Sequence, residues 1–274
     1  SPCIEGTIEL MLSVSRNQVN FIDETFYVIS CIINGCGDKC AKYVDQILDI
    51  IDFGFSTQSP LIIGHSALLM GHLFNKLESH CVHRLDQNLP KLMDLLLDPY
   101  VDNRRDYYSE VISSIAHIID GVGGVNFPFE ASFQYAQKLI GLSKSPINTS
   151  VPSEVEGIYQ VYAAVALGFS VLFKTYGDNP DFLAVFRKMA NKQGKYDNCI
   201  IDFLYYVSDN SAADKDQIMS YLKLIDQFVL VQGKYYNIKL TNKKIMNLLN
   251  FAMCVDDTKT REKAVKLMGI IKRL

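Results

Sequence analysis

The chain has 274 residues, of which 49% are hydrophobic, and its mean hydropathy is +0.08. This composition is typical of a folded protein with a large buried core, and it excludes a disordered chain. The 27 basic and 30 acidic residues leave a net charge of −3. The whole chain therefore lacks the positive field that favours direct binding of nucleic acid or of an anionic membrane, and a basic partner segment fits better.

The cysteines and the apolar runs indicate a soluble protein of a reducing compartment. Seven cysteines are irregularly spaced, which is typical of buried thiols in the cytosol or nucleus rather than of a disulfide framework. The longest apolar runs, such as LIIGHSALLMGHLF, contain His, Gly and Ser and predict no membrane insertion. No signal peptide is visible. Because helical pattern begins almost at Ser1, we expect a C-terminal fragment of a larger protein.

Apolar residues recur at helical spacing along the chain. In YVDQILDIIDF, for example, Tyr43, Ile47, Leu48 and Ile51 share one face. Only KYYNIKL, residues 234–240, alternates as a strand would, and its isolation favours a loop or an extended linker. The polar, proline-bearing stretch 143–153 predicts a surface loop. The fold class is therefore predicted to be all-α.

The helices come in pairs that repeat. VDQIL at Val44 and LDQNL at Leu85 lie 41 residues apart, close to the period of HEAT and armadillo units. Glycine stops at Gly37 and Gly123 lie 86 residues apart, with Asn75 as the stop between them, and later stops are expected at Gly177 and Gly233. The pattern predicts one α-α superhelix, a HEAT/armadillo-like solenoid over residues 1–274, with about six pairs: 4–35, 41–75, 82–121, 129–176, 181–231 and 241–272.

Each pair is predicted to place its first helix in an outer layer and its second helix in an inner layer. The first helix carries aromatic and large aliphatic residues, whereas the second carries small ones, such as Ser66, Ala67 and Gly71. Small residues let helices approach closely, as an inner layer that packs on both neighbours requires.

No motif predicts catalysis, a cofactor or a metal. Cys31, Cys36 and Cys40 run from one helix end into the next helix, away from His80 and His83, so buried thiols and loop histidines explain them better than zinc does. GVGGV at 121–125 follows a helix rather than a strand, so it predicts a helix stop and not a phosphate loop. No histidine or nucleophile converges on a carboxylate. We therefore expect a binding protein, not an enzyme.

Two surfaces of such a stack are candidates for binding. Acidic residues at the starts of helices on the inner face are predicted to receive a basic peptide: Asp23, Glu24, Asp106, Glu110, Glu154, Glu156 and Asp214. The helix dipole offers another explanation for these acids. Grooves between neighbouring outer helices are predicted to accept aromatic side chains, lined by Ile8, Leu12, Tyr43, Ile47, Leu48, Ile51, Leu85, Leu89 and Leu92.

The order of these features over residues 21–124 resembles the C-terminal HEAT repeats of the importin beta family. Asp23 and Glu24 open an inner helix, a glycine stop precedes KYVDQIL, LMDLLL follows one repeat later, and an inner helix ends in IIDGVGG. NKKIMNLL and TREKAVKLMGIIKRL resemble the terminal repeat of the family. In that repeat Lys263, Lys266, Lys272 and Arg273 are expected to solubilise the exposed end.

The resemblance implies a nuclear import receptor of the cytoplasm, nucleus and nuclear pore. It implies that the inner acids bind basic segments of the adaptor importin alpha or of cargo, and that the outer grooves bind phenylalanine-glycine nucleoporins. Ran binding would belong mainly to the absent N-terminal half. Family members place tryptophans against the adaptor and this chain has none, so the resemblance supports the outer grooves more than the adaptor contact. The alternatives are a transportin or exportin, or a HEAT-repeat scaffold subunit of a phosphatase or coat complex.

Overall fold

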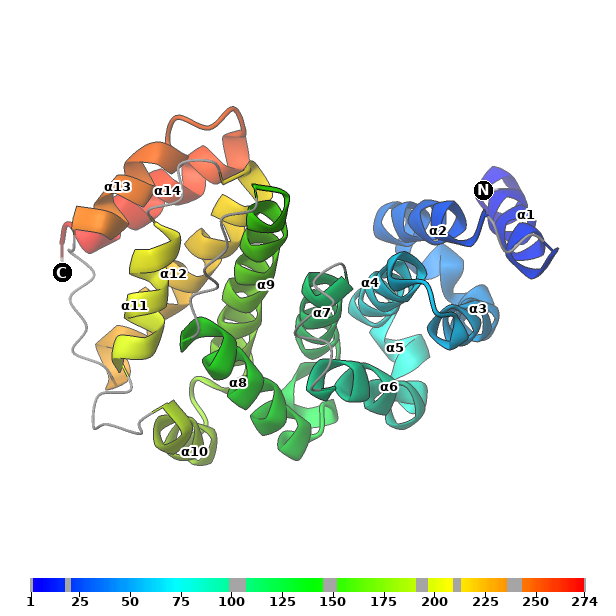
Figure 1. The fold of residues 1–274 in the computed structure, drawn as a ribbon, viewed down its shortest axis with the longest axis horizontal. Coiled ribbons are helices and arrows are strands. Elements are labelled where there is room, and N and C mark those ends of the chain that lie inside the picture. The colour runs from blue at the N-terminus through cyan, green and yellow to red at the C-terminus, as the bar shows by residue number, and fades with distance from the viewer. Residues whose placement is uncertain are drawn as a thin grey trace. The chain divides into compact units, whose positions relative to one another are not determined.

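The computed structural model describes residues 2–17, 21–98, 107–144, 152–190, 197–208, 213–235 and 243–273. Every regular element within these ranges is a helix and none is a strand, which confirms the all-α prediction. The chain divides into two compact units, Ser1–Phe129 (unit 1) and Glu130–Leu274 (unit 2), whose helices are labelled in Figure 1. A single continuous solenoid over residues 1–274 stays a prediction.

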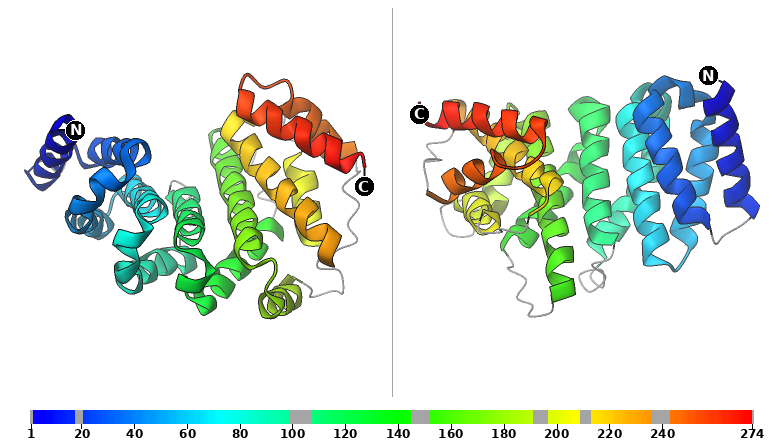
Figure 2. Two further views of the ribbon diagram at one scale, coloured as in Figure 1. Left: turned by 180° about the vertical axis from the view of Figure 1, so that it is seen from behind. Right: turned by 90° about the horizontal axis from the view of Figure 1, so that it is seen from above.

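Unit 1 contains the first three predicted pairs. They are α1 (Pro2–Asn17) with α2 (Ile22–Cys36), α3 (Val44–Ser56) with α4 (Pro60–Lys76), and α6 (Leu85–Leu97) with α7 (Tyr108–Asn126). Short elements join them: η2 (Gly37–Tyr43), α5 (Glu78–Cys81) and η3 (Val82–Arg84). The second helices α2, α4 and α7 pack on one another and form what we call the inner layer of unit 1. The first helices α1, α3 and α6 form its outer layer, and Figure 2 shows the helices of this unit side by side.

The inner layer is held together by close backbone approach. A Cβ atom on Gly71 of α4 would lie 2.8 Å from the Cα of Ser114 on α7, and one on Gly64 would lie 3.0 Å from the Cβ of Tyr107. Contacts this short exist only because these glycines carry no side chain. The prediction that small residues in the second helices allow close packing is confirmed at these contacts.

Four of the five predicted helix stops lie at or next to an observed helix end or at a break in a helix, and one does not. Gly37, just after α2, and Gly123, inside the bounds of α7, adopt positive φ angles of 49° and 70°, which other residues rarely adopt. α4 ends at Lys76, one residue beyond Asn75, and α9 ends at Tyr176, just before Gly177. The stop predicted at Gly233 is wrong, because α12 continues to Tyr235.

Unit 2 contains the other three pairs, and one of them has an additional helix. The pairs are α8 (Phe129–Lys144) with α9 (Pro152–Tyr176), α11 (Asp197–Val207) with α12 (Lys215–Tyr235), and α13 (Lys243–Ala252) with α14 (Thr258–Ile271). α10 (Pro180–Ala190) precedes α11, so the region predicted as one pair over 181–231 holds three helices. Most of the loop predicted at 143–153, and 236–240 of the predicted linker, lie outside the described residues.

Helix α9 forms the centre of unit 2. Its residues 156–176 are long and apolar enough to cross a membrane, a segment that the sequence analysis overlooked. In the folded chain 67% of its most apolar window is buried, because α9 packs on α12 and against α8. Burial in a protein core explains the apolar character of α9.

Candidate functional site

The nine apolar residues predicted to line outer grooves lie in the core of unit 1. None is more than 4% exposed, so no partner can reach them in this structure: Ile8, Leu12, Tyr43, Ile47, Leu48, Ile51, Leu85, Leu89 and Leu92. The physical reason is that the apolar stripe of a first helix packs against its own second helix. The groove-lining prediction for these residues is therefore corrected.

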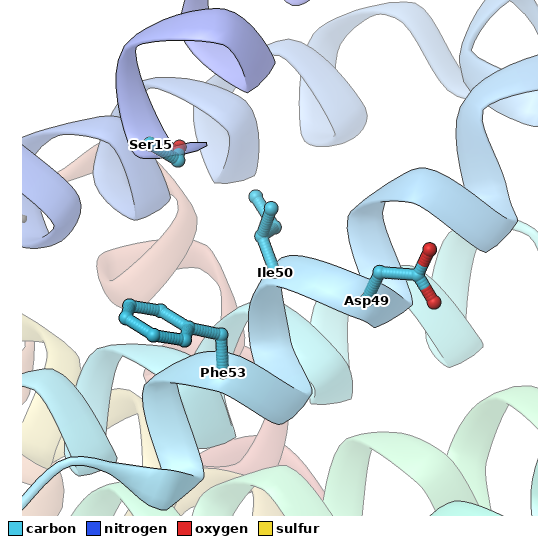
Figure 3. A pocket seen from close by; sticks show the side chains of 4 residues that line it. All are labelled: Ser15, Asp49, Ile50 and Phe53. Carbon is cyan, nitrogen blue, oxygen red and sulfur yellow. The ribbon is translucent and has the colours of Figure 1, made fainter. Parts of the chain in front are cut away.

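An open hollow does lie between the first helices α1 and α3. It has a volume of about 300 Å³ and is lined by Ser15, Asp49, Ile50 and Phe53. Figure 3 shows Ile50 pointing toward Ser15, with Phe53 on one side and Asp49 on the other. Ser15 and Ile50 are 4% and 5% exposed and form the floor, whereas the Phe53 ring is 45% exposed. Because the Ser15 hydroxyl donates to the Met11 carbonyl at 2.8 Å, its hydrogen is already used and the floor favours apolar groups.

Polar bridges fix the position of this hollow. The Lys42 ammonium pairs with Glu5 at 2.5 Å, and the Tyr43 hydroxyl donates to Glu9 at 2.8 Å. These contacts join the end of η2, directly before α3, to the first half of α1. The two helices therefore run side by side in register, which leaves the end of α1 facing Ile50 and Phe53. Hydrogen bonding to Lys42 holds the pKa of Glu5 below its ordinary value.

Ion pairs join α3 to the next first helix, α6, and to the residue before it. Arg84 pairs with Asp45 at 2.8 Å, and Lys91 of α6 pairs with Asp52 of α3 at 2.5 Å. Exposed ion pairs of this kind contribute about 0–1 kcal/mol each, so their main effect is to set the helix register. Asp49 lies between the two paired aspartates in sequence and forms no ion pair with the described residues, which leaves its carboxylate free at the edge of the hollow.

Three of the predicted inner-layer acids lie in the first turns of helices of that layer. Asp23 and Glu24 lie in the first turn of α2, and Glu110 lies in the first turn of α7. α4 runs between them, and a Cβ on its Gly64 would lie 3.5 Å from the Cγ of Glu110. Hydrogen bonding to Glu24 holds the pKa of Asp23 below its ordinary value, and the nearby His65 adds to this shift.

The other predicted acids are not part of this group. Glu156 is exposed on α9 in unit 2, and Glu154 lies in the same helix. Asp106 lies outside the described residues. Asp214 caps α12, where its Oδ1 accepts hydrogen bonds from the backbone amides of Asp216 and Gln217, so helix capping accounts for that residue.

The two units differ strongly in charge. Unit 1 has 16 acidic and 8 basic residues, a net charge of −8, whereas unit 2 has 14 acidic and 19 basic residues, a net charge of +5. The total of −3 conceals this separation. A net negative unit attracts basic partner segments by long-range electrostatics, so the charge of unit 1 favours such partners.

Polar groups also cross the inner layer further along its helices. The Asn34 side-chain amide of α2 lies 3.3 Å from Nδ1 of His72 on α4, and the His72 ring lies 5.3 Å from the ring of His117 on α7. The Asn75 amide donates to the His117 carbonyl at 3.1 Å. Burial lowers the pKa of His72, and Lys76 lowers it further. His72 therefore acts as a packing residue between the helices of the inner layer.

The lowered pKa of His72 predicts a loss of stability in acid. Between the folded-state pKa and the ordinary value of 6.5 the unfolded chain binds more protons than the folded one, so stability falls as the pH falls below about 6.5. His72→Gln should therefore lose less stability than the wild type when urea unfolding is measured at pH 7.5 and then at pH 5.5. The same substitution at exposed His80 serves as the control and should leave the difference unchanged, whereas an equal effect of both would contradict the assignment to His72.

The described part of the chain shows no metal-binding group, and its two buried cysteines have thiols of raised pKa. Among those residues no group of three or more His, Cys, Asp or Glu is placed to hold a metal ion. Cys40 and Cys81 are buried, and burial raises the pKa of both thiols, that of Cys81 to about 12. These two thiols are therefore protonated and unreactive at neutral pH.

Sequence reasoning missed the residues that shape the hollow. It selected Ile47, Leu48 and Ile51 of α3, whereas the hollow is lined by Ile50, which is buried at its floor, and by the exposed Phe53 on the flank of that stripe. The available signal was Phe53 itself, a large aromatic residue on the polar side of an amphipathic helix.

Comparison with known proteins rests on structure alone, since no family model and no curated protein matches the sequence. A crystal structure of importin beta superposes with a TM-score of 0.77 at 14% identity, over 99% of this chain and 31% of that one. Yeast importin beta, Kap95p, gives a TM-score of 0.77 at 15% identity, over 99% of this chain and 31% of that one. Kap95p described with RanGDP gives 0.70 at 15% identity, over 100% and 31%.

The chain thus spans about a third of the length of the importin beta structures that it matches. At 14–15% identity the likeness concerns the fold. Together with the paired helices of both units, it confirms the predicted fold class: the chain is an α-α helical-repeat protein with the architecture found in importin beta.

Proposed function

We propose that this chain is part of a nuclear import receptor of the importin beta type. In this proposal it binds phenylalanine-glycine nucleoporins and basic segments of importin alpha or cargo as it passes between cytoplasm and nucleus. The observation that carries the proposal is the hollow between α1 and α3, which opens between neighbouring first helices of an importin-beta-like fold. Ran would bind mainly through parts of the receptor outside this chain.

The hollow has the size and chemistry to hold one aromatic side chain. An engineered cavity of about 150 Å³ holds benzene, so about 300 Å³ leaves room for a phenylalanine ring and its attachment. The ring would rest on Ile50 and lie against Phe53, and aromatic pairs contribute about 0.5–1.5 kcal/mol beyond their buried area. Single weak contacts of this size suit a receptor that must release each repeat quickly.

The inner layer of unit 1 has the charge to receive a basic segment. Asp23 and Glu24 lie in the first turn of α2 and Glu110 lies in the first turn of α7, and unit 1 carries a net charge of −8. No tryptophan is present, so recognition would depend on charge and on exposed side chains such as Tyr27 of α2, which is 69% exposed. We therefore expect this contact to weaken with added salt, whereas aromatic binding in the hollow should persist.

Replacing Phe53 with alanine should weaken binding to phenylalanine-glycine repeats roughly fivefold, because the loss of about 1 kcal/mol of aromatic contact corresponds to that factor. The chain would be passed over immobilised repeats at physiological salt and its retention compared with the wild type. Phe53 is half exposed, so the variant should keep its fold, as circular dichroism would verify.

Phe251→Ala provides a matched control, since Phe251 is 40% exposed but lies in unit 2, far along the chain from the hollow. The proposal requires normal retention of this control. Equal loss in both variants would point to non-specific apolar binding, and unchanged retention of Phe53→Ala would rule out the hollow as the repeat site. A scaffold protein would show no retention in any form.

A further inference from the structure

The last helix of unit 2 carries a basic surface that the proposed function does not use. Residues 243–273 contain eight basic and three acidic residues, a net charge of +5, in a chain whose total is −3. The terminal pair α13 and α14 therefore accounts for a positive charge equal to that of all of unit 2. Because the positive charge is concentrated in this pair, the positions of the individual lysines and arginines on α14 decide which surface can bind an acidic ligand.

One side of α14 is fully engaged within unit 2. Ala264, Leu267 and Ile271 are buried, and α14 packs on α12 and α13. Lys263, expected from the sequence to solubilise the exposed end, instead pairs with Asp226 of α12 at 2.5 Å and is half-buried. Arg261 donates to the Val255 carbonyl at 2.9 Å, and Asp257 caps the helix by accepting from the Thr260 amide at 2.8 Å. The charges on this side are therefore neutralised within the unit.

The opposite side of α14 is exposed, and among its cations Arg273 donates a hydrogen bond from its Nε to the Gly269 carbonyl at 2.8 Å. We call its exposed residues, together with the two that follow the helix end at Ile271, the α14 basic face: Lys259, Glu262, Val265, Lys266, Lys272 and Arg273. Within the described chain Lys259, Lys266 and Lys272 form no ion pair, and Val265 at the centre is 57% exposed. Lys259 and Lys266 on α14, followed by Lys272 and Arg273 after its end, form with the exposed Val265 a surface suited to a ligand that is both acidic and partly apolar.

We propose that the α14 basic face binds an acidic peptide segment of a partner protein, one in which glutamates or aspartates flank an aliphatic side chain. Charge complementarity selects the acidic residues, and Val265 selects the apolar one. A nucleic acid fits less well, because no aromatic residue of this face can stack on a base, whereas the exposed Val265 offers a contact for an aliphatic side chain. α14 spans about 21 Å, enough for roughly six residues of extended peptide.

The test uses the full chain and a short fluorescein-labelled peptide of glutamates interrupted by single leucines. Fluorescence anisotropy at low salt should give a Kd for the wild type, and a Kd that is roughly tenfold higher for the double variant K259E/K266E, because two attractions become repulsions. The control K39E/K76E changes the net charge equally on exposed lysines of unit 1 and should leave the Kd unchanged. V265S should weaken the leucine peptide but not a peptide of glutamate alone.

Several results would overturn the proposal. Equal weakening by both double variants would mean that total charge, not this face, governs binding. Equal affinity for a matched glutamine peptide would exclude charge recognition, and tighter binding of single-stranded DNA than of the peptide would make the face a nucleic-acid surface. Self-association of the wild type that K259E/K266E abolishes would assign the face to acidic unit 1 of a second copy.

Discussion

Replacing Gly121 with alanine should lower the free energy of unfolding of unit 1 by about 2–3 kcal/mol. A Cβ atom at this position would lie 2.5 Å from both the Asn75 Cα and the Phe74 carbonyl oxygen of α4. Both are backbone atoms, so no side-chain rotation relieves the clash and α7 must move away from α4. Overpacking of this kind costs about 1–3 kcal/mol, and a backbone contact lies at the upper end. Alanine's higher helix propensity, about 1 kcal/mol, offsets only part of it.

The effect should be local to unit 1. Hydrogen exchange followed by mass spectrometry would report faster exchange in α4 and α7, with α12 and α14 unchanged. Gly269→Ala is the matched control, since no atom lies within 4 Å of a Cβ placed there in α14, and it should be neutral or slightly stabilising. Normal exchange in Gly121→Ala would show that α4 and α7 are not packed as closely as described.

Truncating Phe186 to alanine should destabilise unit 2 by about 3–5 kcal/mol, the usual cost for a buried phenylalanine. Phe186 of α10 is 1% exposed. Its ring lies 5.2 Å from that of Phe173 and 6.2 Å from that of Phe169, both on α9, in edge-on geometry. The substitution would remove these aromatic contacts and leave a cavity between α9 and α10.

Urea unfolding followed by circular dichroism, together with hydrogen exchange in α9, measures this loss. Val185→Ala is the control on the same helix, because Val185 is 37% exposed and should change stability by no more than about 0.5 kcal/mol. If Phe186→Ala unfolded like the control, α10 would be a loosely attached insertion rather than part of the unit 2 core.

Much of the fold could be predicted because the signals for helices and repeats are local. The period of 3.6 in the apolar residues marks each helix, and stops such as Gly37 and Gly123 need a backbone conformation that favours glycine. α10 could not be separated from α11 in this way, since the stretch between them carries no strong stop signal. The stop predicted at Gly233 was wrong because a glycine inside a helix weakens the helix without ending it.

The candidate site was harder to predict because exposure is a tertiary property. The residues at the centre of the apolar stripe of α3 are buried by neighbouring helices, whereas a residue at its edge is exposed. Periodicity alone does not predict how much of the stripe the neighbouring helices cover. Ile47, Leu48 and Ile51 are covered, whereas Phe53, two residues further, is not. The position of the acids Asp23, Glu24 and Glu110 in the first turns of α2 and α7 could be predicted, because it follows from the repeat, whereas their role in binding stays a prediction. The charge difference between the units was accessible from sequence only once the unit boundary was known.

The proposal that this chain is an import-receptor module rests on recognition of phenylalanine-glycine repeats. The most direct measurement compares retention of the wild-type chain on two otherwise identical columns, one bearing such repeats and the other bearing the same sequence with every phenylalanine replaced by serine. We expect clear retardation on the first column at physiological and at raised salt, and none on the second. Elution at the same volume from both columns would contradict the proposed function.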